Sequence, residues 1–367
     1  MSEIKSLTGI RGLAAIIVAI HHFNSKYVLD FLISSDNKII NYYLLNFADN
    51  GYLMVELFFI LSGFVLALSY DQKIKLLDKN IYWDFMVRRF NRIYPLYFFS
   101  VIIYFILFSK NHFNDIDSFF INLFFLEVWF PREFTLNNVF WSLCTEWFAY
   151  LLFPFVLVTA LFRNKPFFYF LLIALLIFIL APVLNTERLY DDVEYWILDL
   201  RMSNGTGAFL RCLGSYCIGL AIFKIYKDYP RFVVILGKKW IIIFILIVFF
   251  YSFSKTDIIL CFLFGGLILA VTNNNPLSRL FSSKPVYFLG LISYSVYLNH
   301  MMFLRILIFS FNKNYWQLST SNLVIGFILF ISLTLIFSYL TYVLIEKKIG
   351  NYLLTIFRNR TRLLIAR

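Results

Sequence analysis

Apolar stretches separated by short polar segments recur along the whole chain. Most of them approach the ~20 residues that an α-helix needs to cross a bilayer. One apolar piece, Phe119–Phe130, is shorter and is followed by Pro131, which favours a re-entrant or interfacial helix. The pattern predicts an all-α polytopic membrane protein with about ten transmembrane helices, at residues 8–24, 51–70, 93–109, 140–162, 167–184, 207–223, 240–253, 257–272, 286–311 and 322–345.

Composition and charge agree with this architecture. The 367 residues are 61% hydrophobic and the mean hydropathy is +0.76, whereas a soluble domain is nearer half apolar. The net charge of +12 does not indicate a nucleic-acid partner, because Lys and Arg gather in alternate loops. Segments predicted to be cytoplasmic hold 23 of them and outer segments hold 8, which is the asymmetry that orients membrane proteins. We therefore expect both termini in the cytoplasm.

The chain divides into one long bundle, residues 1–350, and a basic cytoplasmic tail, residues 351–367, which we expect to lie near the anionic inner leaflet. The four cysteines lie in or beside apolar spans, so they indicate neither a disulfide framework nor a metal site. The four histidines include no His-Glu-x-x-His spacing. We therefore expect no metal.

The first predicted span carries two polar groups on one helical face. Arg11 and His22 are eleven residues apart, which is about three turns and ~16 Å along one stripe. Buried ionisable groups are costly in a span and usually face a bundle interior or a water-filled cavity, so they suggest a functional site. The neighbouring His21 points to a different face. The simpler alternative for either histidine is an interfacial position near the outer end of the span.

Six short segments carry a resemblance to a known family. They are IRGLAAIIVAIHHF, GYLMVELFFILSGF, RRFNRIYP, WSLCTEWFAYLLFP, SYSVYLNH and LIEK, in this order along the chain. Each resembles a motif of the membrane acyltransferase 3 family, and together they cover most of the chain. One departure is Lys348, which stands where that family usually has Pro.

The resemblance implies an integral enzyme that moves an acyl group, commonly acetyl from acetyl-CoA, to a hydroxyl group of a cell-envelope polysaccharide or lipid-linked sugar. The acyl-CoA would be a co-substrate, with no permanently bound cofactor. The resemblance also implies a bacterial cytoplasmic membrane, with membrane lipids as further partners. Some relatives carry a fused extracytoplasmic hydrolase-like domain. We expect this chain to be a stand-alone acyltransferase. A separate extracytoplasmic protein is then a candidate partner.

Acyl transfer from a thioester needs a base or a nucleophile, and His22 suits either role because its proton equilibrium lies near neutral pH. The sequence does not choose between a general base and a covalent acyl carrier. We expect the buried carboxylate of Glu146 to fix the His22 tautomer. The alternative is that Glu146 accepts hydrogen bonds from local hydroxyl groups, such as that of Ser142, four residues earlier.

Arg89 and Arg92 lie at the predicted cytoplasmic end of the third span, in the segment that resembles an Arg-x-x-Arg motif. Because guanidinium groups pair with phosphate through two parallel hydrogen bonds, we expect them to bind CoA together with Arg11. Positive charge at a cytoplasmic loop, which membrane orientation alone requires, is the alternative explanation.

Other polar groups in or near spans either pair with one another to hold the bundle together or line the acceptor cavity. They are Glu56, Ser142, Arg211, Tyr297, His300, Arg305 and Glu346. Ser62 and Gly63 are expected to allow close helix packing.

Two other functions fit parts of the pattern. Ten spans with buried charges also suit a multi-span transporter or flippase. An acyltransferase acting on a small secreted molecule is a second alternative. Transfer of label from acetyl-CoA to a product distinguishes an acyltransferase from a carrier.

The topology predicts which loops are accessible from outside the cell. In a background without native cysteines, single cysteines in loops 25–50 and 185–206 should react with an impermeant thiol reagent in intact cells. Cysteines in 71–80 and 351–367 should react only after permeabilisation. Labelling of the C-terminal tail from outside would contradict the ten-span topology.

Overall fold

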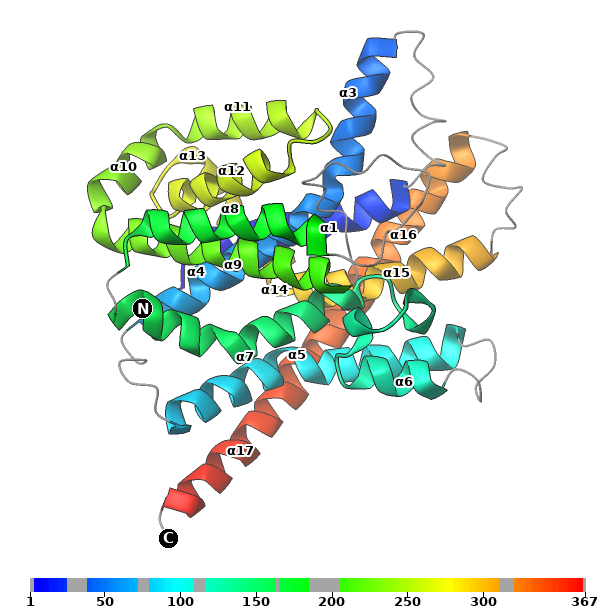
Figure 1. Ribbon diagram of the computed structural model, residues 1–367. Helices are drawn as coiled ribbons and strands as arrows, with labels where there is room; N and C mark the ends of the chain where they lie inside the picture. Colours follow the sequence, from blue (N-terminus) through cyan, green and yellow to red (C-terminus); the bar gives the residue numbers. More distant parts are fainter. Residues whose placement is uncertain are drawn as a thin grey trace.

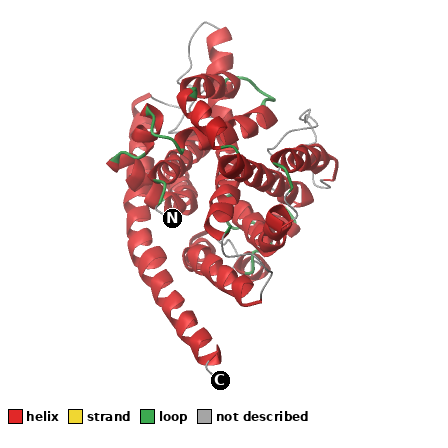
Figure 2. Cartoon of the chain, turned by 90° about the vertical axis from the view of Figure 1, so that its left-hand side faces the viewer, coloured by secondary structure: helices red, strands yellow, loops and turns green. Residues whose placement is uncertain are grey.

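The computed structural model describes residues 3–24, 38–71, 79–108, 116–162, 165–184, 205–310 and 320–365. Within these ranges the chain is helical and has no strand (Figures 1 and 2). The helices are α1 (Lys5–Asn24), α3 (Lys38–Asp49), η1 (Asn50–Leu53), α4 (Met54–Tyr70), α5 (Lys79–Phe108), α6 (Ile116–Leu123), η2 (Glu127–Trp129), η3 (Arg132–Phe134), α7 (Phe140–Phe162), α8 (Phe167–Leu184), α9 (Gly205–Asp228), α10 (Pro230–Lys238), α11 (Trp240–Tyr251), α12 (Asp257–Val271), α13 (Pro276–Phe281), α14 (Lys284–Leu291), α15 (Ser293–Ser310), α16 (Thr320–Thr341), η4 (Tyr342–Ile349) and α17 (Gly350–Ile365).

Among the described residues, six helices are long and apolar enough to cross a membrane. Two bent pairs, α10 with α11 and α14 with α15, raise this number to eight if each pair forms one span. The apolar parts of α7 and α12 are shorter. The predicted spans thus fall on helical segments, but the span predicted at 286–311 is divided between α14 and α15, which are bent by 71°. Ten crossings and the cytoplasmic location of the termini stay predictions. Loops 25–37, 72–78 and 185–204, which carry much of the predicted topology, lie outside the described residues.

The outer surface of the bundle is apolar. Along α8 the side chains of Leu172, Leu176, Leu180 and Val183 are exposed, and α16 exposes a similar row. Soluble monomers rarely present contiguous apolar patches of this kind, because apolar surface in contact with water is unfavourable. Lipid tails remove that cost. Together with the long apolar helices, this surface identifies an integral membrane protein.

The segment predicted to be re-entrant or interfacial forms the short helix α6 and then turns back. Its eight residues span only ~12 Å, well short of a bilayer core. Phe125 follows with a φ of 58°, in the left-handed region, and its ring stacks on Tyr97 at a centroid distance of 4.2 Å. Helix α6 itself also packs beside α5.

Helices α4 and α9 cross closely, and glycines face each other at the crossing. A Cβ atom on Gly63 would lie 2.7 Å from the carbonyl oxygen of Tyr216, and one on Gly219 would lie 2.5 Å from that of Ile60. Small residues at such crossings let backbones approach closely in membranes. The expected packing role of Gly63 is confirmed by this geometry.

At the C-terminal end, α16 passes through a π-helical stretch, Tyr342–Ile349, into α17. Figures 1 and 2 show α17 extending away from the bundle to the C-terminus. The predicted basic tail is thus helical up to Ile365. Its arginine side chains lie outside the described residues, so their contact with the inner leaflet stays a prediction.

The α4–α9 crossing predicts the effect of one added methyl group. Gly219→Ala should lower the free energy of unfolding of the detergent-purified protein by about 1–3 kcal/mol, and with it the melting temperature. The reason is that backbone atoms, rather than a flexible side chain, occupy the space that the added methyl group needs. Gly266→Ala is the matched control, since its Cβ atom would lie 3.9 Å from the nearest Ile243 atoms. Equal melting temperatures for the two variants would contradict the close approach.

Candidate active site

Helix α1 carries both polar groups singled out in the sequence, one near each end. It packs against α4, α14 and α15. The alanines and Val18 on the inner side of α1 are fully buried. Arg11 and His22 thus enter two separate polar clusters, separated by about three helical turns along α1.

The first cluster is a histidine pair. Nδ1 of His22 lies 3.2 Å from Nε2 of His300, which is fully buried on α15. Each ring also contacts a carbonyl one turn earlier on its own helix: His22 Nδ1 is 3.0 Å from the Val18 oxygen, and His300 Nδ1 is 3.1 Å from the Val296 oxygen. The two ring centroids are 5.1 Å apart.

These contacts assign the protons for two neutral rings. A carbonyl oxygen only accepts, so Nδ1 of His300 must donate to Val296, which leaves Nε2 of His300 as an acceptor. Nδ1 of His22 then faces two acceptors and must carry the proton that it shares between them. The same assignment leaves the lone pair of His22 on Nε2, the nitrogen that can act as a base or nucleophile.

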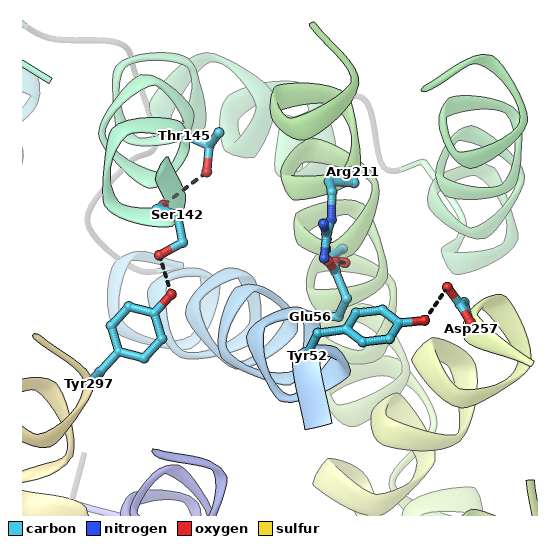
Figure 3. Close-up of polar contacts among 8 residues, drawn as sticks. Tyr52, Glu56, Ser142, Thr145, Arg211, Asp257 and Tyr297 are labelled. Carbon is cyan, nitrogen blue, oxygen red and sulfur yellow. Dashed lines mark hydrogen bonds and ion pairs between the residues drawn. The ribbon is translucent and has the colours of Figure 1, made fainter. Parts of the chain in front are cut away.

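The adjacent His21 belongs to a different face, as the sequence predicts. Its Nδ1 lies 3.1 Å from the carbonyl oxygen of Ala48, at the end of α3. Its ring centroid is 6.2 Å from that of Tyr52. The hydroxyl of Tyr52 donates to Asp257 at 2.8 Å (Figure 3).

Ser142 and Tyr297 extend the histidine cluster towards α7. Their hydroxyl oxygens are 2.7 Å apart and face each other in Figure 3. The ring of Tyr297 lies 6.0 Å from that of His300, measured between centroids. The expected shared face of Tyr297 and His300 is therefore observed, and a buried hydroxyl pair adjoins the histidines.

The second cluster gathers around Arg11 at the other end of α1. The charge of Arg11 interacts with those of Arg92, Glu146 and Glu346, which come from three different elements. Glu146 accepts hydrogen bonds from Ser62 at 2.9 Å and from Tyr150 at 2.5 Å. Tyr216 approaches the same carboxylate oxygen at 3.4 Å.

This arrangement corrects one expectation for Glu146 and one for Ser62. The charge of Glu146 acts on Arg11, and its carboxylate binds hydroxyl groups, whereas Nδ1 of His22 faces His300 and Val18. Ser142, the proposed local partner of Glu146, donates instead to the carbonyl oxygen of Val139 at 3.1 Å and pairs with Tyr297. Ser62 is not merely a small packing residue, because its hydroxyl binds Glu146. Sequence spacing alone does not show which side chains of other helices meet Glu146.

Arg92 forms an ion pair with Glu346 in the π-helical stretch. Ser295 also donates to this carboxylate, at 3.1 Å. Glu346 thus has the pairing expected of a residue that supports the bundle, and its partner belongs to the arginine cluster. The wider π-helical turn changes the direction of the side chains along the helix, and such turns often occur at functional sites.

Arg89 has a different environment, although it is only three residues from Arg92. Its guanidinium lies 5.9 Å from the Tyr150 ring centroid and 6.0 Å from that of Phe85, and it bonds to the Tyr70 side chain. Its buried Nε has no hydrogen-bond partner among the described residues. An unsatisfied buried donor is costly, so this nitrogen is suited to an anionic ligand.

Glu56 and Arg211 form a buried ion pair that joins α4 to α9. Arg211 and Glu56 lie side by side in Figure 3, and Arg211 Nε donates to Glu56 at 2.7 Å. Ser215 donates to the other carboxylate oxygen, and the guanidinium lies 4.8 Å from the Trp141 ring centroid. Glu56 and Arg211 therefore pair with each other and hold two helices together, which is one of the two alternatives expected from the sequence.

Arg305 lies outside this ion pair. It donates to the Leu136 carbonyl oxygen at 2.8 Å and stacks near Tyr104 and Phe108, so it too has structural contacts.

Sequence reasoning missed three hydroxyl groups around Glu146 and the direct contact between the two histidines. Tyr150 could have been identified, because it is four residues from Glu146 on the same helix. Ser62 and Tyr216 come from other helices, and no local pattern links them to Glu146. The pairing of His22 with His300 joins residues 278 apart in the sequence.

Comparison with known proteins supports one family. The model of the acyltransferase 3 family, described as an acyltransferase domain, matches residues 4–343. The chain is 25% identical to peptidoglycan O-acetyltransferase OatA of Listeria monocytogenes over 335 residues, which cover 81% of this chain and 49% of that protein. It is 32% identical to acyltransferase MdmB of Streptomyces mycarofaciens over 162 residues, 41% of this chain and 38% of that protein.

A third relative is the putative peptidoglycan O-acetyltransferase YrhL of Bacillus subtilis, 30% identical over 149 residues, 35% of this chain and 23% of that protein. The matched regions thus span less than half the length of each of these relatives. No solved structure gives a significant match. Because the family model covers nearly the whole chain, this integral membrane protein belongs to the acyltransferase 3 family.

Proposed function

We propose that this protein is a membrane O-acyltransferase that moves an acetyl group from acetyl-CoA to a hydroxyl group of a cell-envelope glycan or lipid-linked sugar. Membership of the acyltransferase 3 family favours this activity over a transporter or flippase. Two of the three relatives compared above are named as peptidoglycan O-acetyltransferases, which supports acetyl as the acyl group and a glycan as the acceptor.

The observation that carries the proposal is the division of α1 into an arginine end and a histidine end. A CoA thioester has phosphates at one end and the reactive carbonyl at the other, joined by a long flexible arm. The arginine cluster would hold the phosphates, and the arm would extend along α1 towards His22. The two polar clusters, ~16 Å apart along one helix, match this distribution of charge and reactivity.

At the histidine end, the lone pair on Nε2 of His22 does the chemistry. As a general base, it takes the proton of the acceptor hydroxyl while the oxygen attacks the thioester carbonyl. The carbon–sulfur bond then breaks, and the CoA thiolate takes the proton from His22. As an acyl carrier, the same nitrogen would attack the carbonyl first. Trapping labelled acetyl on His22 after rapid denaturation would distinguish the carrier from the base.

At the arginine end, Arg89 is the strongest candidate for a phosphate ligand. Its buried Nε lacks a partner among the described residues, whereas Arg92 is already paired with Glu346. Arg11 adds positive charge at the same end of α1. We propose that Arg89 binds a CoA phosphate directly, and that Arg92 contributes charge balanced by Glu346.

We place the arginine end at the cytoplasmic face, where CoA is available, and the histidine end in the outer half of the bundle. The protein would then carry the acetyl group between the two sides of the membrane along α1. The acceptor would approach from the outer side or from within the membrane. The buried hydroxyls of Ser142 and Tyr297, next to the histidine pair, are suited to orienting a sugar hydroxyl.

His22 should be essential and His21 should not. We expect His22→Ala to lower acetyl transfer by at least on the order of 100-fold, because the proton acceptor is lost. His21→Ala should retain a large part of the activity, since its ring contacts Ala48 on another face. Transfer from radiolabelled acetyl-CoA to isolated envelope glycan measures both, with membrane insertion checked by immunoblot. The reverse order of effects would refute the assignment of His22.

Replacing Arg89 should raise the KM for acetyl-CoA. We expect Arg89→Gln to weaken binding on the order of 10- to 100-fold, which corresponds to a charged hydrogen bond, and Arg89→Lys to restore only part of it because the fork geometry is lost. Arg88→Gln is a matched control, since Arg88 is the next residue and pairs locally with Asp84 at 2.7 Å. An unchanged KM in Arg89→Gln would leave this arginine with only a topological role.

Arg92 needs a paired substitution. Arg92→Gln alone removes the ion-pair partner of the Glu346 carboxylate, whose side chain is 3% exposed, and should lower the stability. Because the Arg92 side chain is 37% exposed, the loss should be smaller than the about 3–5 kcal/mol of a fully buried pair. The double variant Arg92→Gln with Glu346→Gln removes both charges and should fold. We expect its KM for acetyl-CoA to rise less than that of Arg89→Gln. A larger rise would make Arg92 the principal phosphate ligand.

A further inference from the structure

We infer that His300 is a positioning residue that fixes the ring of His22 and stabilises the positive charge that His22 acquires during acyl transfer. This inference rests on the proposed function. It assigns to a neutral imidazole the role that a carboxylate has in many acyl-transfer sites.

The geometry comes from a contact between two helices far apart in the sequence. Nε2 of His300 lies 3.2 Å from Nδ1 of His22, within hydrogen-bond range. The orientation of His300 is itself fixed, because its Nδ1 lies 3.1 Å from the Val296 carbonyl oxygen and its side chain is fully buried. His300 can therefore present only its Nε2 lone pair to His22 while both rings are neutral.

The direction of this hydrogen bond matters for catalysis. When His22 takes the proton of the acceptor hydroxyl at Nε2, the ring becomes an imidazolium ion with an N–H group at each nitrogen. The N–H at Nδ1 then points towards the acceptors that already face it, the lone pair of His300 and the carbonyl oxygen of Val18. A charge-assisted hydrogen bond is stronger than a neutral one, so both contacts strengthen as charge develops.

The same argument holds if His22 carries the acyl group. Attack by Nε2 on the thioester carbonyl produces an acylated, positively charged ring, and the CoA thiolate leaves with the electron pair of the carbon–sulfur bond. The Nδ1 proton remains in place and still donates to His300. Attack by the acceptor hydroxyl oxygen on the acyl carbon breaks the bond to Nε2 and returns the ring to the neutral form, and the CoA thiolate takes the hydroxyl proton. The positioning role is therefore independent of which of the two chemical roles His22 performs.

His300 also explains why Glu146 is not needed beside His22. A carboxylate at this depth would have to be buried with its charge, which costs free energy unless it is paired. Two neutral imidazoles bury no formal charge in the resting state. The cost of desolvation then arises only while His22 is cationic, when the hydrogen bonds to Nδ1 offset part of it.

Two substitutions separate positioning from packing. His300→Leu fills the site with an apolar side chain of roughly similar size and removes the hydrogen-bond acceptor. His300→Gln places an amide oxygen near the position of Nε2 and so keeps an acceptor for His22. We expect His300→Leu to lower kcat on the order of 100-fold with the KM for acetyl-CoA changed less than twofold, and His300→Gln to recover about 10-fold of that loss. A merely structural residue would give equal losses in both variants.

The second measurement does not depend on activity. The chain has four histidines, so ¹⁵N-histidine labelling of the full-length protein in nanodiscs gives few ring signals. We expect a scalar coupling across the hydrogen bond between Nδ1 of His22 and Nε2 of His300, and its loss in His300→Leu. Detection of a proton on Nε2 of His300 in the resting protein would overturn the inference, because the hydrogen bond would then run in the opposite direction.

The two measurements also separate this inference from the proposed function. An inactive wild-type protein that shows the coupling would refute the proposed function and, with it, the catalytic role of His300. An active wild-type protein without the coupling would refute the inference alone. Equal kcat values for His300→Leu and His300→Gln, or a raised KM with an unchanged kcat, would also refute it.

Discussion

Charged groups buried in this bundle pair across helices, and these pairs join elements that are far apart in the sequence. A buried charge without a counter-charge costs several kcal/mol. Glu56 therefore meets Arg211, and Glu346 meets Arg92, in each case across two elements far apart in the sequence. Glu146 collects hydroxyl groups from α4, α7 and α9. These contacts hold together the helices that carry the candidate active site.

Helix α1 sets the distance between the two polar clusters. A regular helix has a fixed rise per residue, so the separation of Arg11 from His22 follows from their spacing and does not depend on loop conformation. Its neighbours α4, α14 and α15 hold it on several sides. Sites built on packed helices are more precise than sites built on loops. A donor with charge at one end and a thioester at the other needs such a fixed separation.

The two clusters differ in whether their side chains carry permanent charge. The arginine cluster contains permanent charges that balance one another and can be shared with an anionic ligand. The histidine cluster contains neutral groups, His22, His300, Ser142 and Tyr297, and acquires charge only during a reaction. A carboxylate beside His22 would have placed permanent charge in the apolar part of the bundle. Glu146 instead binds the hydroxyl groups of Ser62 and Tyr150, and its charge acts on Arg11.

The sequence by itself determined the helical membrane architecture, the family and the residues of α1, because hydropathy and helical periodicity are local properties. It also indicated the packing role of Gly63. It could not determine partners between helices: the pairing of His22 with His300, or of Arg92 with Glu346, depends on how helices hundreds of residues apart are rotated. Nor did it reveal the π-helical turn that presents Glu346 or the bends between α10 and α11 and between α14 and α15. Only tertiary packing decides which face of each helix meets which neighbour, and for that reason Glu146 was expected beside His22 and lies instead with Arg11.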